Sequence, residues 1–367
     1  MNRVSDKQLP FVSVIMSLRN EERFLPRSLA AIEEQDYPKD RYELIAVDGG
    51  STDRSVEILK SYHLSVSHTT VATGRNLTIP AAMNLGIRDA HGRVIIKLDA
   101  HGYASRNFIR GIVDRLCQQT NLGAVGGRIV QLGETRAAQA NGWARTSTFG
   151  AGKGPYTGGQ EEGDVSSVQC GGYRREVLDK VGMFDEKIGL GEDEELNWRI
   201  VKAGYRILFT PAVQFFYYAR PTLGALFCQY LWYGDGRTLV LRKHPDFFRI
   251  KHLVPTLFVI ALLLCFCLAL VSATGRYLLA GLLAAYGLGL LVSSASLARD
   301  KGWHYFPHFP GSFFVMHMGY GIGFLRGVLN YWIFAKHARF PVAKQRVQEV
   351  ASESAFTSPE SSCTRDS

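Results

Sequence analysis

FVSVIMSLRNEERFLPRSLAAI, residues 11–32, contains the first complete unit of the fold. Residues 11–18 are apolar and rich in residues that favour β-structure, and a charged segment follows them at residues 19–22. Leucine and isoleucine residues then recur at the three- and four-residue spacing of a helix. The order strand, polar loop, helix is typical of an α/β unit.

Further strand patterns end in polar loops in the same way. Residues 42–47 form an apolar run that ends at Asp48, and residues 94–98 form another that runs into Asp99. Strands that alternate with helices predict an α/β fold with a mostly parallel sheet flanked by helices. Ligands of such sheets bind beyond the carboxyl ends of the strands, so Arg19, Asp48 and Asp99 are expected to converge there.

The net charge of +9 is compatible with nucleic-acid binding, but no basic helix, aromatic RNA-binding motif or metal-finger spacing accompanies it. No nucleic-acid partner is therefore expected. Many basic residues instead precede the long apolar segments, where they suit an anionic leaflet or form a solvated charged face. These residues are Arg237, Arg242, Lys243, Arg249 and Lys251.

The six cysteines show neither metal-site spacing nor a compact disulfide framework, and two of them lie inside an apolar segment. They are expected to be buried thiols in a reducing compartment. The residues before Pro10 lack the apolar core of a signal peptide, so the N-terminal region is expected to stay in the cytoplasm.

Two apolar segments predict a helical membrane anchor. Residues 253–273 carry no charge, and about 20 such residues are enough to cross a bilayer core. Arg276 interrupts the pattern, and residues 277–298 supply a second span. Two crossings return the chain to the cytoplasmic side, where Arg299 and Lys301 agree with the positive-inside bias.

A third apolar segment, residues 313–334, contains His317 and Arg326 and is followed by several cations. Those cations would lie outside the cell if the segment crossed the membrane. An interfacial or re-entrant helix is therefore favoured over a full span.

Four polar motifs follow predicted strands or open a predicted helix. They are, in order, Val12-Ser13-Val14-Ile15-Met16 with Arg19-Asn20-Glu21-Glu22, Val47-Asp48-Gly49-Gly50-Ser51-Thr52-Asp53, Asp99-Ala100-His101, and Gly191-Glu192-Asp193-Glu194-Glu195-Leu196 with Arg199. Each motif alone is weak, but together, over residues 10–245, they resemble the signature of family 2 glycosyltransferases with the GT-A fold. Within that family the chain most resembles the bacterial exopolysaccharide glucosyltransferases of the succinoglycan type.

The resemblance implies a nucleoside diphosphate sugar as donor, expected to be UDP-linked. The family holds the nucleotide with the loop after the first strand and the aspartate after the second, which here are Ser17, Arg19, Glu21 and Asp48. Carboxylates suit this role because they accept hydrogen bonds from a base N–H or from ribose hydroxyls. Gly49 stands where the family usually has a second acid, and a turn with a helix N-cap is the alternative use of this segment.

Three further residues resemble positions that line the donor site. Arg75 and Asn84 fall in the corresponding family segment, and Arg128 is expected to reach the diphosphate. The planar fork of arginine matches phosphate oxygens. Surface or core roles are the alternatives.

Asp99 matches the first acid of the family's Asp-X-Asp metal motif, and His101 stands where the second acid usually is. The resemblance implies a divalent metal, Mn²⁺ or Mg²⁺, that neutralises the departing diphosphate as a Lewis acid. An imidazole can bind Mn²⁺ whereas Mg²⁺ prefers oxygen, so Mn²⁺ is favoured. A plain turn at a strand end is the alternative.

Gly191-Glu192-Asp193 resembles the acidic motif whose aspartate is the catalytic base. Asp193, with Glu192 beside it, is therefore expected to take the proton of the acceptor hydroxyl in a single displacement that inverts the anomeric carbon. Crowded carboxylates raise one another's pKa, which suits a base. Stabilisation of a helix N-terminus through its dipole is the alternative.

Gln229 and Trp232 fall where processive polysaccharide synthases carry a Gln-X-X-Arg-Trp motif, with Leu231 in place of the arginine. Both residues are expected at the acceptor site, where a tryptophan stacks on a sugar face. Arg237 is placed with them, either to assist the diphosphate or to extend its charge along the membrane surface. Amphipathic packing at that surface is the alternative for the whole segment.

These expectations describe an inverting glycosyltransferase that adds a sugar to a lipid-linked or exopolysaccharide acceptor at the cytoplasmic face of the inner membrane. Residues 1–245 are expected to be the catalytic domain, residues 246–340 the membrane region, and residues 341–367 a basic and then disordered tail. Residues 150–164 form either a mobile lid or a plain surface loop.

Two alternative functions remain. A processive synthase needs a channel, which so few spans would supply only in an oligomer. A non-catalytic membrane scaffold is indicated by Gly49 and His101 at positions that are usually acidic.

Overall fold

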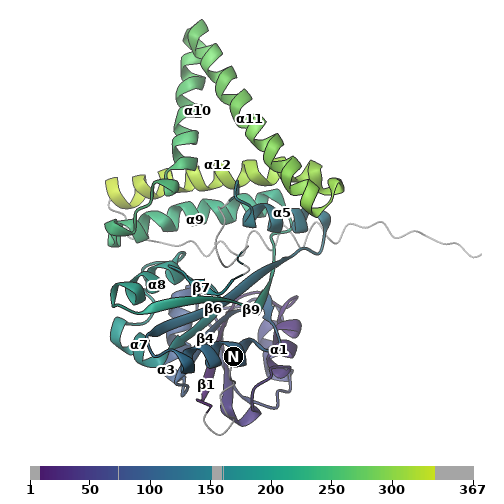
Figure 1. Ribbon diagram of the computed structural model, residues 1–367, viewed down its shortest axis with the longest axis vertical. Helices are drawn as coiled ribbons and strands as arrows, with labels where there is room; N and C mark the ends of the chain where they lie inside the picture. Colours follow the sequence, from purple (N-terminus) through teal and green to yellow (C-terminus); the bar gives the residue numbers. More distant parts are fainter. Residues whose placement is uncertain (1–8, 73, 151–158, 160, 335–367) are drawn as a thin grey trace, which may run out of the picture.

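The computed structural model describes residues 9–72, 74–150, 159 and 161–334, which form a sheet domain beneath a helical region (Figure 1). The nine-stranded sheet of this described part has the order β3-β2-β1-β4-β8-β6-β9-β5, and β7 pairs with β9. The strands are β1 (Val12–Leu18), β2 (Tyr42–Asp48), β3 (Ser67–Ala72), β4 (Val94–Asp99), β5 (Gly102–Ala104), β6 (Leu122–Leu132), β7 (Gly163–Asp164), β8 (Gly171–Arg174) and β9 (Arg206–Tyr218).

The first half of the sheet is parallel. β1 pairs in parallel with β2 and β4, and β2 pairs in parallel with β3. The second half is mixed, because β8 is antiparallel to both β4 and β6 whereas β9 is parallel to β6. The predicted α/β fold is confirmed, and its parallel arrangement belongs to the half that carries the first three motifs.

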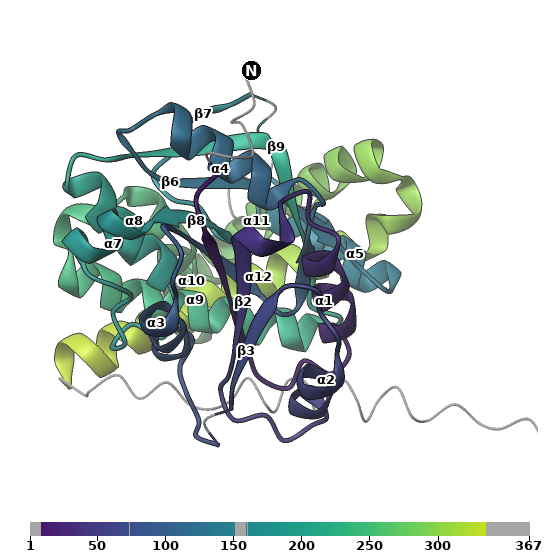
Figure 2. The ribbon, with the colours of Figure 1, turned by 90° about the horizontal axis from the view of Figure 1, so that it is seen from below.

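Helices cover both faces of the sheet (Figure 2). On one face, Leu29 and Phe108 from α1 and α4 pack into the same core as Val14 of β1. On the other face, Met83 of α3 belongs to the core of Ile15, because neighbouring side chains of a strand point to opposite faces. The helices of this domain are α1 (Leu25–Glu33), α2 (Ser55–Ser61), α3 (Ile79–Asp89), α4 (Phe108–Gln118), α5 (Arg136–Thr146), α7 (Arg175–Val181) and α8 (Glu192–Lys202).

Two long helices, α9 (Leu223–Lys243) and α12 (Phe309–Gly327), lie side by side above the sheet (Figure 1). Glycines spaced four residues apart on α12 let the two backbones approach closely. A Cβ atom at Gly319, Gly323 or Gly327 would lie only 2.7, 2.0 or 2.3 Å from an atom of α9. The contact fixes the position of α9 over the sheet.

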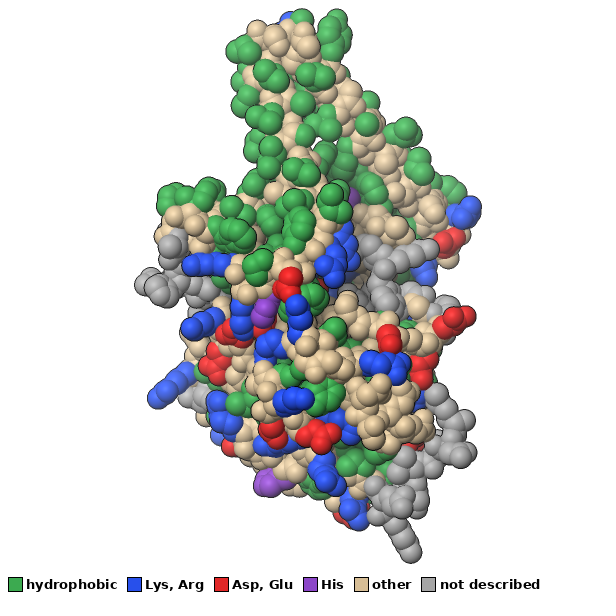
Figure 3. Space-filling model, turned by 60° about the vertical axis from the view of Figure 1, so that its left-hand side comes forward, with side chains coloured by type: hydrophobic (Ala, Val, Ile, Leu, Met, Phe, Trp, Pro, Cys, Tyr) green, Lys and Arg blue, Asp and Glu red, His purple; other side chains and the backbone are tan. Residues whose placement is uncertain are grey.

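Two apolar helices, α10 (Val254–Val271) and α11 (Ala273–Lys301), project from this layer and expose their hydrophobic side chains (Figure 3). Their mean hydropathies are 2.9 and 1.9, and both are long and apolar enough to cross a membrane. The turn between them lies at Ser272 and not at the predicted Arg276. Ser272 is extended and accepts the N–H of Gly275 at 3.0 Å, so it caps the start of α11.

The third apolar segment forms α12 and then the π-helical turn Val328–Ile333. α12 begins before the predicted residue 313, and it runs along α9 across the foot of α10 and α11 instead of beside them (Figure 1). A place for α12 at the membrane surface stays a prediction. The predicted tail, and most of the polar loop at residues 150–164, lie outside the described residues.

Candidate active site

The carboxyl ends of three adjacent strands meet at one edge of the sheet. β1 lies between β2 and β4, and Leu18 is the register partner of Asp48 while Ser17 is the partner of Asp99. The predicted convergence of these strand ends is therefore confirmed. Any ligand held there contacts three loops that are distant in sequence.

The loop after β1 is bonded to the loop after β2. The side-chain oxygen of Asn20 accepts the N–H of Thr52 at 2.7 Å, and the N–H of Glu21 donates to the Ser55 hydroxyl at 2.8 Å. Asn20 has a φ of 55°, a left-handed conformation that asparagine tolerates better than most residues. The two loops thus form one connected rim at the edge of the sheet.

Asp48 holds the turn that follows β2. Its carboxylate is 2% exposed and accepts the N–H groups of Gly50 at 3.0 Å and Ser51 at 3.1 Å. Gly50 has a φ of 90°, and a Cβ there would lie 2.8 Å from the carbonyl oxygen of Arg75, so this turn requires glycine. The turn proposed as the alternative use is present, and the nucleotide roles of Asp48 and the exposed Arg75 stay predictions.

Lys97 is a site residue that the motifs did not predict. It lies on β4 two residues before Asp99, so the two side chains project from the same face of the strand. Its side chain is 3% exposed, and Nζ lies 2.6 Å from both carboxylate oxygens of Asp193 and 3.2 Å from Glu192. A lysine in an otherwise apolar strand was the available signal, because a buried ammonium needs a carboxylate partner.

The four acids that open α8 are divided among separate partners. The first two contact Lys97. Glu194 lies 2.6 Å from the guanidinium of Arg237, and the fully buried Glu195 lies 2.8 Å from that of Arg199. A general interaction with the helix dipole does not account for this specific pairing.

The pKa of Asp193 is raised to about 7. Burial raises it, the Lys97 ammonium lowers it, and the charges of Glu192 and Asp99 raise it further. Burial also lowers the pKa of Lys97, but Asp193, Glu192 and Asp99 hold it well above its ordinary value. Asp99 therefore acts on Asp193 across the site, and the Asp193 carboxyl titrates at a pH that suits general base catalysis.

His101 lies between Glu21 and Tyr217. Its Nδ1 is 3.4 Å from a carboxylate oxygen of Glu21, and its ring meets the Tyr217 ring edge-on with the centroids 4.7 Å apart. Burial lowers the pKa of His101, whereas Tyr217, Glu21 and Asp99 raise it above its ordinary value. The predicted nucleotide residue Glu21 thus orients the imidazole of the predicted metal residue.

Asp99 and His101 offer a carboxylate and an imidazole at the end of β4. Among the residues that the structure describes, no group of three or more histidine, cysteine or acidic side chains is arranged to hold a metal ion. A metal at this edge would therefore be completed by donor phosphates and water, an arrangement that small divalent ions use with few protein ligands. The roles of Asp99 and His101 as the protein ligands of such a metal stay predictions.

One face of α9 covers the site. Gln229, Tyr233 and Arg237 follow one another at four-residue spacing, and the amide of Gln229 donates at 3.1 Å to the hydroxyls of both Tyr217 and Tyr233. The Arg145 guanidinium lies 4.7 Å from the centre of the Tyr217 ring and donates to Tyr233 at 3.4 Å. Sequence patterns did not reveal this cluster, because its members come from α5, β9 and α9.

The charges around Tyr217 connect this cluster to the metal residues. Burial raises the pKa of the Tyr217 hydroxyl, but His101, Arg220 and Arg145 lower it to about 7. The charge of Asp99 acts on the same hydroxyl in the opposite direction. The cluster and the end of β4 therefore belong to one electrostatic environment.

Trp232 lies against α12 rather than beside Tyr217. The Arg326 guanidinium stands 5.2 Å from its ring centre, and Arg326 also pairs with Asp235 at 3.2 Å. The aromatic residue bonded into the site is Tyr233, one position further along. Successive side chains on a helix differ in direction by about 100°, so Trp232 and Tyr233 point to different sides of α9. The stacking of Trp232 on a sugar stays a prediction.

Asn84 and Arg128 have protein partners. The buried Asn84 amide donates to the carbonyl of Phe184 at 2.8 Å and accepts its N–H at 2.9 Å. Asn84 therefore holds the segment before α8, and its role in the donor site stays a prediction. Arg128 donates to the carbonyl of Gly159 at 2.8 Å, and its contact with a diphosphate stays a prediction.

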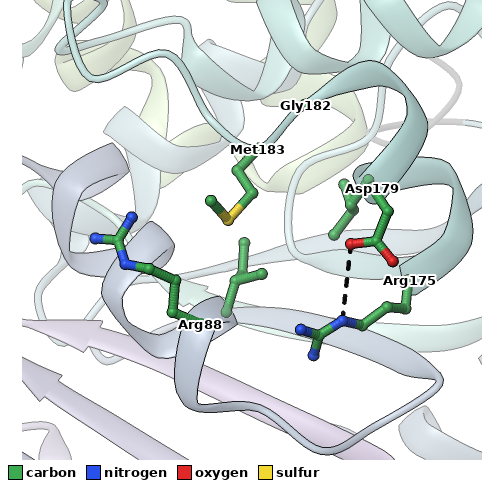
Figure 4. A pocket seen from close by; sticks show the side chains of 7 residues that line it. Arg88, Arg175, Asp179, Gly182 and Met183 are labelled. Carbon is green, nitrogen blue, oxygen red and sulfur yellow. Dashed lines mark ion pairs between the residues drawn. The ribbon is translucent and has the colours of Figure 1, made fainter.

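A cavity of about 360 Å³ lies elsewhere, between α3 and α7 (Figure 4). Arg88, Arg175 and Asp179 line it, with Arg175 paired to Asp179 at 3.9 Å. None of the predicted site residues lines this cavity, so it is separate from the edge of the sheet where the motifs meet.

Known proteins resemble this chain in sequence and in fold. Residues 13–182 match the family model Glycosyl transferase family 2. The chain is 25% identical over 328 residues, 87% of its own length and 98% of the relative's, to dolichyl N-acetyl-alpha-D-glucosaminyl phosphate 3-beta-D-2,3-diacetamido-2,3-dideoxy-beta-D-glucuronosyltransferase of Methanococcus voltae. It is 28% identical to the succinoglycan biosynthesis protein ExoA of Rhizobium meliloti, over 78% of this chain and 86% of that one.

A solved structure supports the fold assignment. The mannosyltransferase PcManGT from Pyrobaculum calidifontis, in complex with GDP-Man and Mn²⁺, superposes with a TM-score of 0.57 and 21% sequence identity. The superposition covers 88% of each chain. The chain therefore carries a glycosyl transferase family 2 domain built on the GT-A fold.

Proposed function

We propose that this enzyme is an inverting glycosyltransferase that moves a sugar from a nucleoside diphosphate sugar to a lipid-linked or polysaccharide acceptor. The observation that carries the proposal is the ion pair between Asp193 of α8 and Lys97 of β4. Lys97 lies on the same strand as Asp99. The ion pair brings a carboxyl that titrates near neutral pH to the strand end where a donor diphosphate would bind.

The placement of these groups supports a single displacement as the reaction. Asp193 accepts the proton of the acceptor hydroxyl while that oxygen forms a bond to the anomeric carbon. The bond from this carbon to the diphosphate breaks, and its electron pair leaves with the diphosphate. One displacement inverts the configuration of the carbon.

The departing charge needs neutralisation. Asp99 and His101 would hold a divalent metal, which supplies Lewis acidity toward the diphosphate oxygens when it is bound. Ser17, Arg19, Glu21 and the rim of the two loops would hold the nucleotide. The proposed donor is a UDP-sugar, and a GDP-sugar is the alternative because the structural neighbour was solved in complex with GDP-Man.

A membrane position for the site supports the choice of acceptor. α10 and α11 form a hairpin whose two ends lie on the side of α9 (Figure 1), so two crossings would keep the catalytic domain, residues 1–245, at one membrane face. A cytoplasmic location of that face is supported by the positive residues at the foot of this hairpin, which are Arg249, Lys251, Arg299 and Lys301. The relative from Methanococcus voltae is named for a dolichyl-linked acceptor.

The direct test uses the full chain in lipid nanodiscs with a panel of UDP- and GDP-sugars and polyprenyl-phosphate-linked acceptors. We expect one donor to be consumed with inversion of the anomeric carbon, and Asp193→Asn to abolish transfer. Retention of configuration, or turnover by Asp193→Asn equal to that of the unmodified chain, would contradict the proposal.

A further inference from the structure

Lys97 is buried on β4, where its ammonium has little contact with water. Its side chain is 3% exposed, and the neighbouring positions Ile96 and Leu98 project into the core on the other face. An ammonium removed from water is costly unless carboxylates surround it. Asp193 supplies two oxygens at 2.6 Å and Glu192 a third at 3.2 Å, which match the three donors of the ammonium.

The position of α8 does not depend on this contact alone. Leu196 and Ile200 anchor the helix in the core that also contains Ile15 and Met83. Glu195 also bonds Arg199, whose guanidinium donates to the carbonyls of Val181, Gly182 and Met183. What Lys97 adds is the orientation of the two carboxylates in the first turn of α8.

The contact with Asp193 is symmetrical, since both oxygens lie at the same distance from Nζ. A carboxylate held in this way has one orientation, whereas an unpaired aspartate rotates about its side-chain bonds. The Lys97 charge also offsets the repulsion between Asp193 and the neighbouring acids Glu192 and Asp99.

We propose that Lys97 is a positioning residue for Asp193, whose ammonium fixes the carboxylate in the orientation from which it meets the acceptor hydroxyl. This inference rests on the proposed function of Asp193 as the base. Replacement of Lys97 should therefore change kcat and leave donor binding unchanged.

The test compares Lys97→Met and Lys97→Arg with the unmodified chain in nanodiscs, using whichever sugar nucleotide of the panel supports transfer. Lys97→Met should lower kcat by about 100-fold, the lower end of what a positioned general base contributes, with the donor KM unchanged. Lys97→Arg should recover part of the loss, because it restores the charge. The control is Lys60→Met on the exposed surface of α2, which should match the unmodified chain.

The outcomes separate this inference from the proposed function. If Asp193→Asn abolishes transfer while Lys97→Met keeps kcat within about threefold, the role of Lys97 is wrong and the role of Asp193 stands. If Asp193→Asn remains active, both fail. If thermal unfolding shows that Lys97→Met does not fold, Lys97→Gln replaces it in the test. If neither variant folds, the contact is purely structural and the inference is overturned.

Discussion

The amide of Gln229 on α9 donates to the hydroxyl of Tyr217 on β9 at 3.1 Å, and this bond joins the helical layer to the sheet directly above the site. The same amide donates to Tyr233 at 3.1 Å. One side chain thus sets both tyrosines relative to the end of β4.

Replacement of Gln229 by leucine should loosen this connection. The two lost bonds leave buried hydroxyls with fewer partners, which costs about 1–3 kcal/mol. We expect a lower thermal unfolding midpoint and a raised KM for the acceptor, with the donor KM unchanged. Tyr233→Phe removes one of these two bonds together with the longer bond from Arg145. It keeps the bond from Gln229 to Tyr217, so the acceptor KM should rise less than in Gln229→Leu. A raised donor KM with a normal acceptor KM would contradict the assignment of α9 to the acceptor side.

The pH dependence of turnover should follow Asp193. Its pKa is about 7, and a base must be unprotonated to accept a proton, so kcat should rise as the pH increases through about 7. Lys97 lowers this pKa, so Lys97→Met should move the rise to higher pH. The measurement is kcat at saturating substrates between pH 5 and 9, a range of about two units on either side of this pKa. A kcat that stays constant from pH 5 to 9, as an aspartate with an ordinary pKa of about 4 would give, would contradict it.

Glu195 should stabilise the fold without acting in the reaction. Its carboxylate lies 2.8 Å from Arg199, 2.7 Å from Lys243 and 2.9 Å from His244. Burial raises the pKa of Glu195, but the bonds from these three side chains lower it to about 2. Since the folded pKa lies below the unfolded one, this contribution is present above about pH 4.5 and is lost as the pH falls toward 2.

Glu195→Gln removes the charge that these cations share. We expect a loss of about 3 kcal/mol in the free energy of unfolding at neutral pH, because breaking a buried ion pair leaves cations uncompensated. Thermal unfolding at pH 7 and at acidic pH measures this difference, which should shrink at the lower pH. An equal difference at both values would contradict the assignment.

The close crossing of α9 and α12 should be sensitive to a single methyl group. A Cβ at Gly323 would lie 2.0 Å from the carbonyl oxygen of Leu231, so Gly323→Ala should force the helices apart at a cost of about 1–3 kcal/mol. Because α9 carries Gln229 and Tyr233, activity should fall as well. Gly281→Ala on α11 is the matched control, since nothing lies within 4 Å of its Cβ position, and it should behave as the unmodified chain.

Metal use should depend on the pair at the end of β4. Removal of divalent ions by a chelator should abolish transfer, and Mn²⁺ should restore it better than Mg²⁺ because His101 offers nitrogen. His101→Asp should shift the preference toward Mg²⁺, which prefers oxygen ligands. Full activity in the chelator would contradict the metal assignment.

Local patterns in the sequence predicted β1, β2 and β4 and the acids of α8, because apolar runs and polar loop motifs are properties of adjacent residues. The register of β1 with its neighbours then placed Ser17 beside Asp99. Motif position did not single out Tyr233, which is the aromatic residue of this helix that Gln229 contacts, and the acceptor role of Trp232 stays a prediction.

Other features depend on contacts between distant segments. The partners of Lys97 lie 95 and 96 residues away, and the cluster of Arg145, Tyr217 and Tyr233 joins three elements. The glycine spacing on α12 was a readable signal for close helix packing, but its partner, α9, was not identifiable from the sequence.

The account depends most on Asp193 as the group that takes the acceptor proton. The decisive measurement is transfer by Asp193→Asn alongside the binding of its sugar nucleotide by calorimetry, in nanodiscs with metal present. We predict loss of transfer by about 100-fold or more with nucleotide binding retained. Transfer at the rate of the unmodified chain would contradict the account.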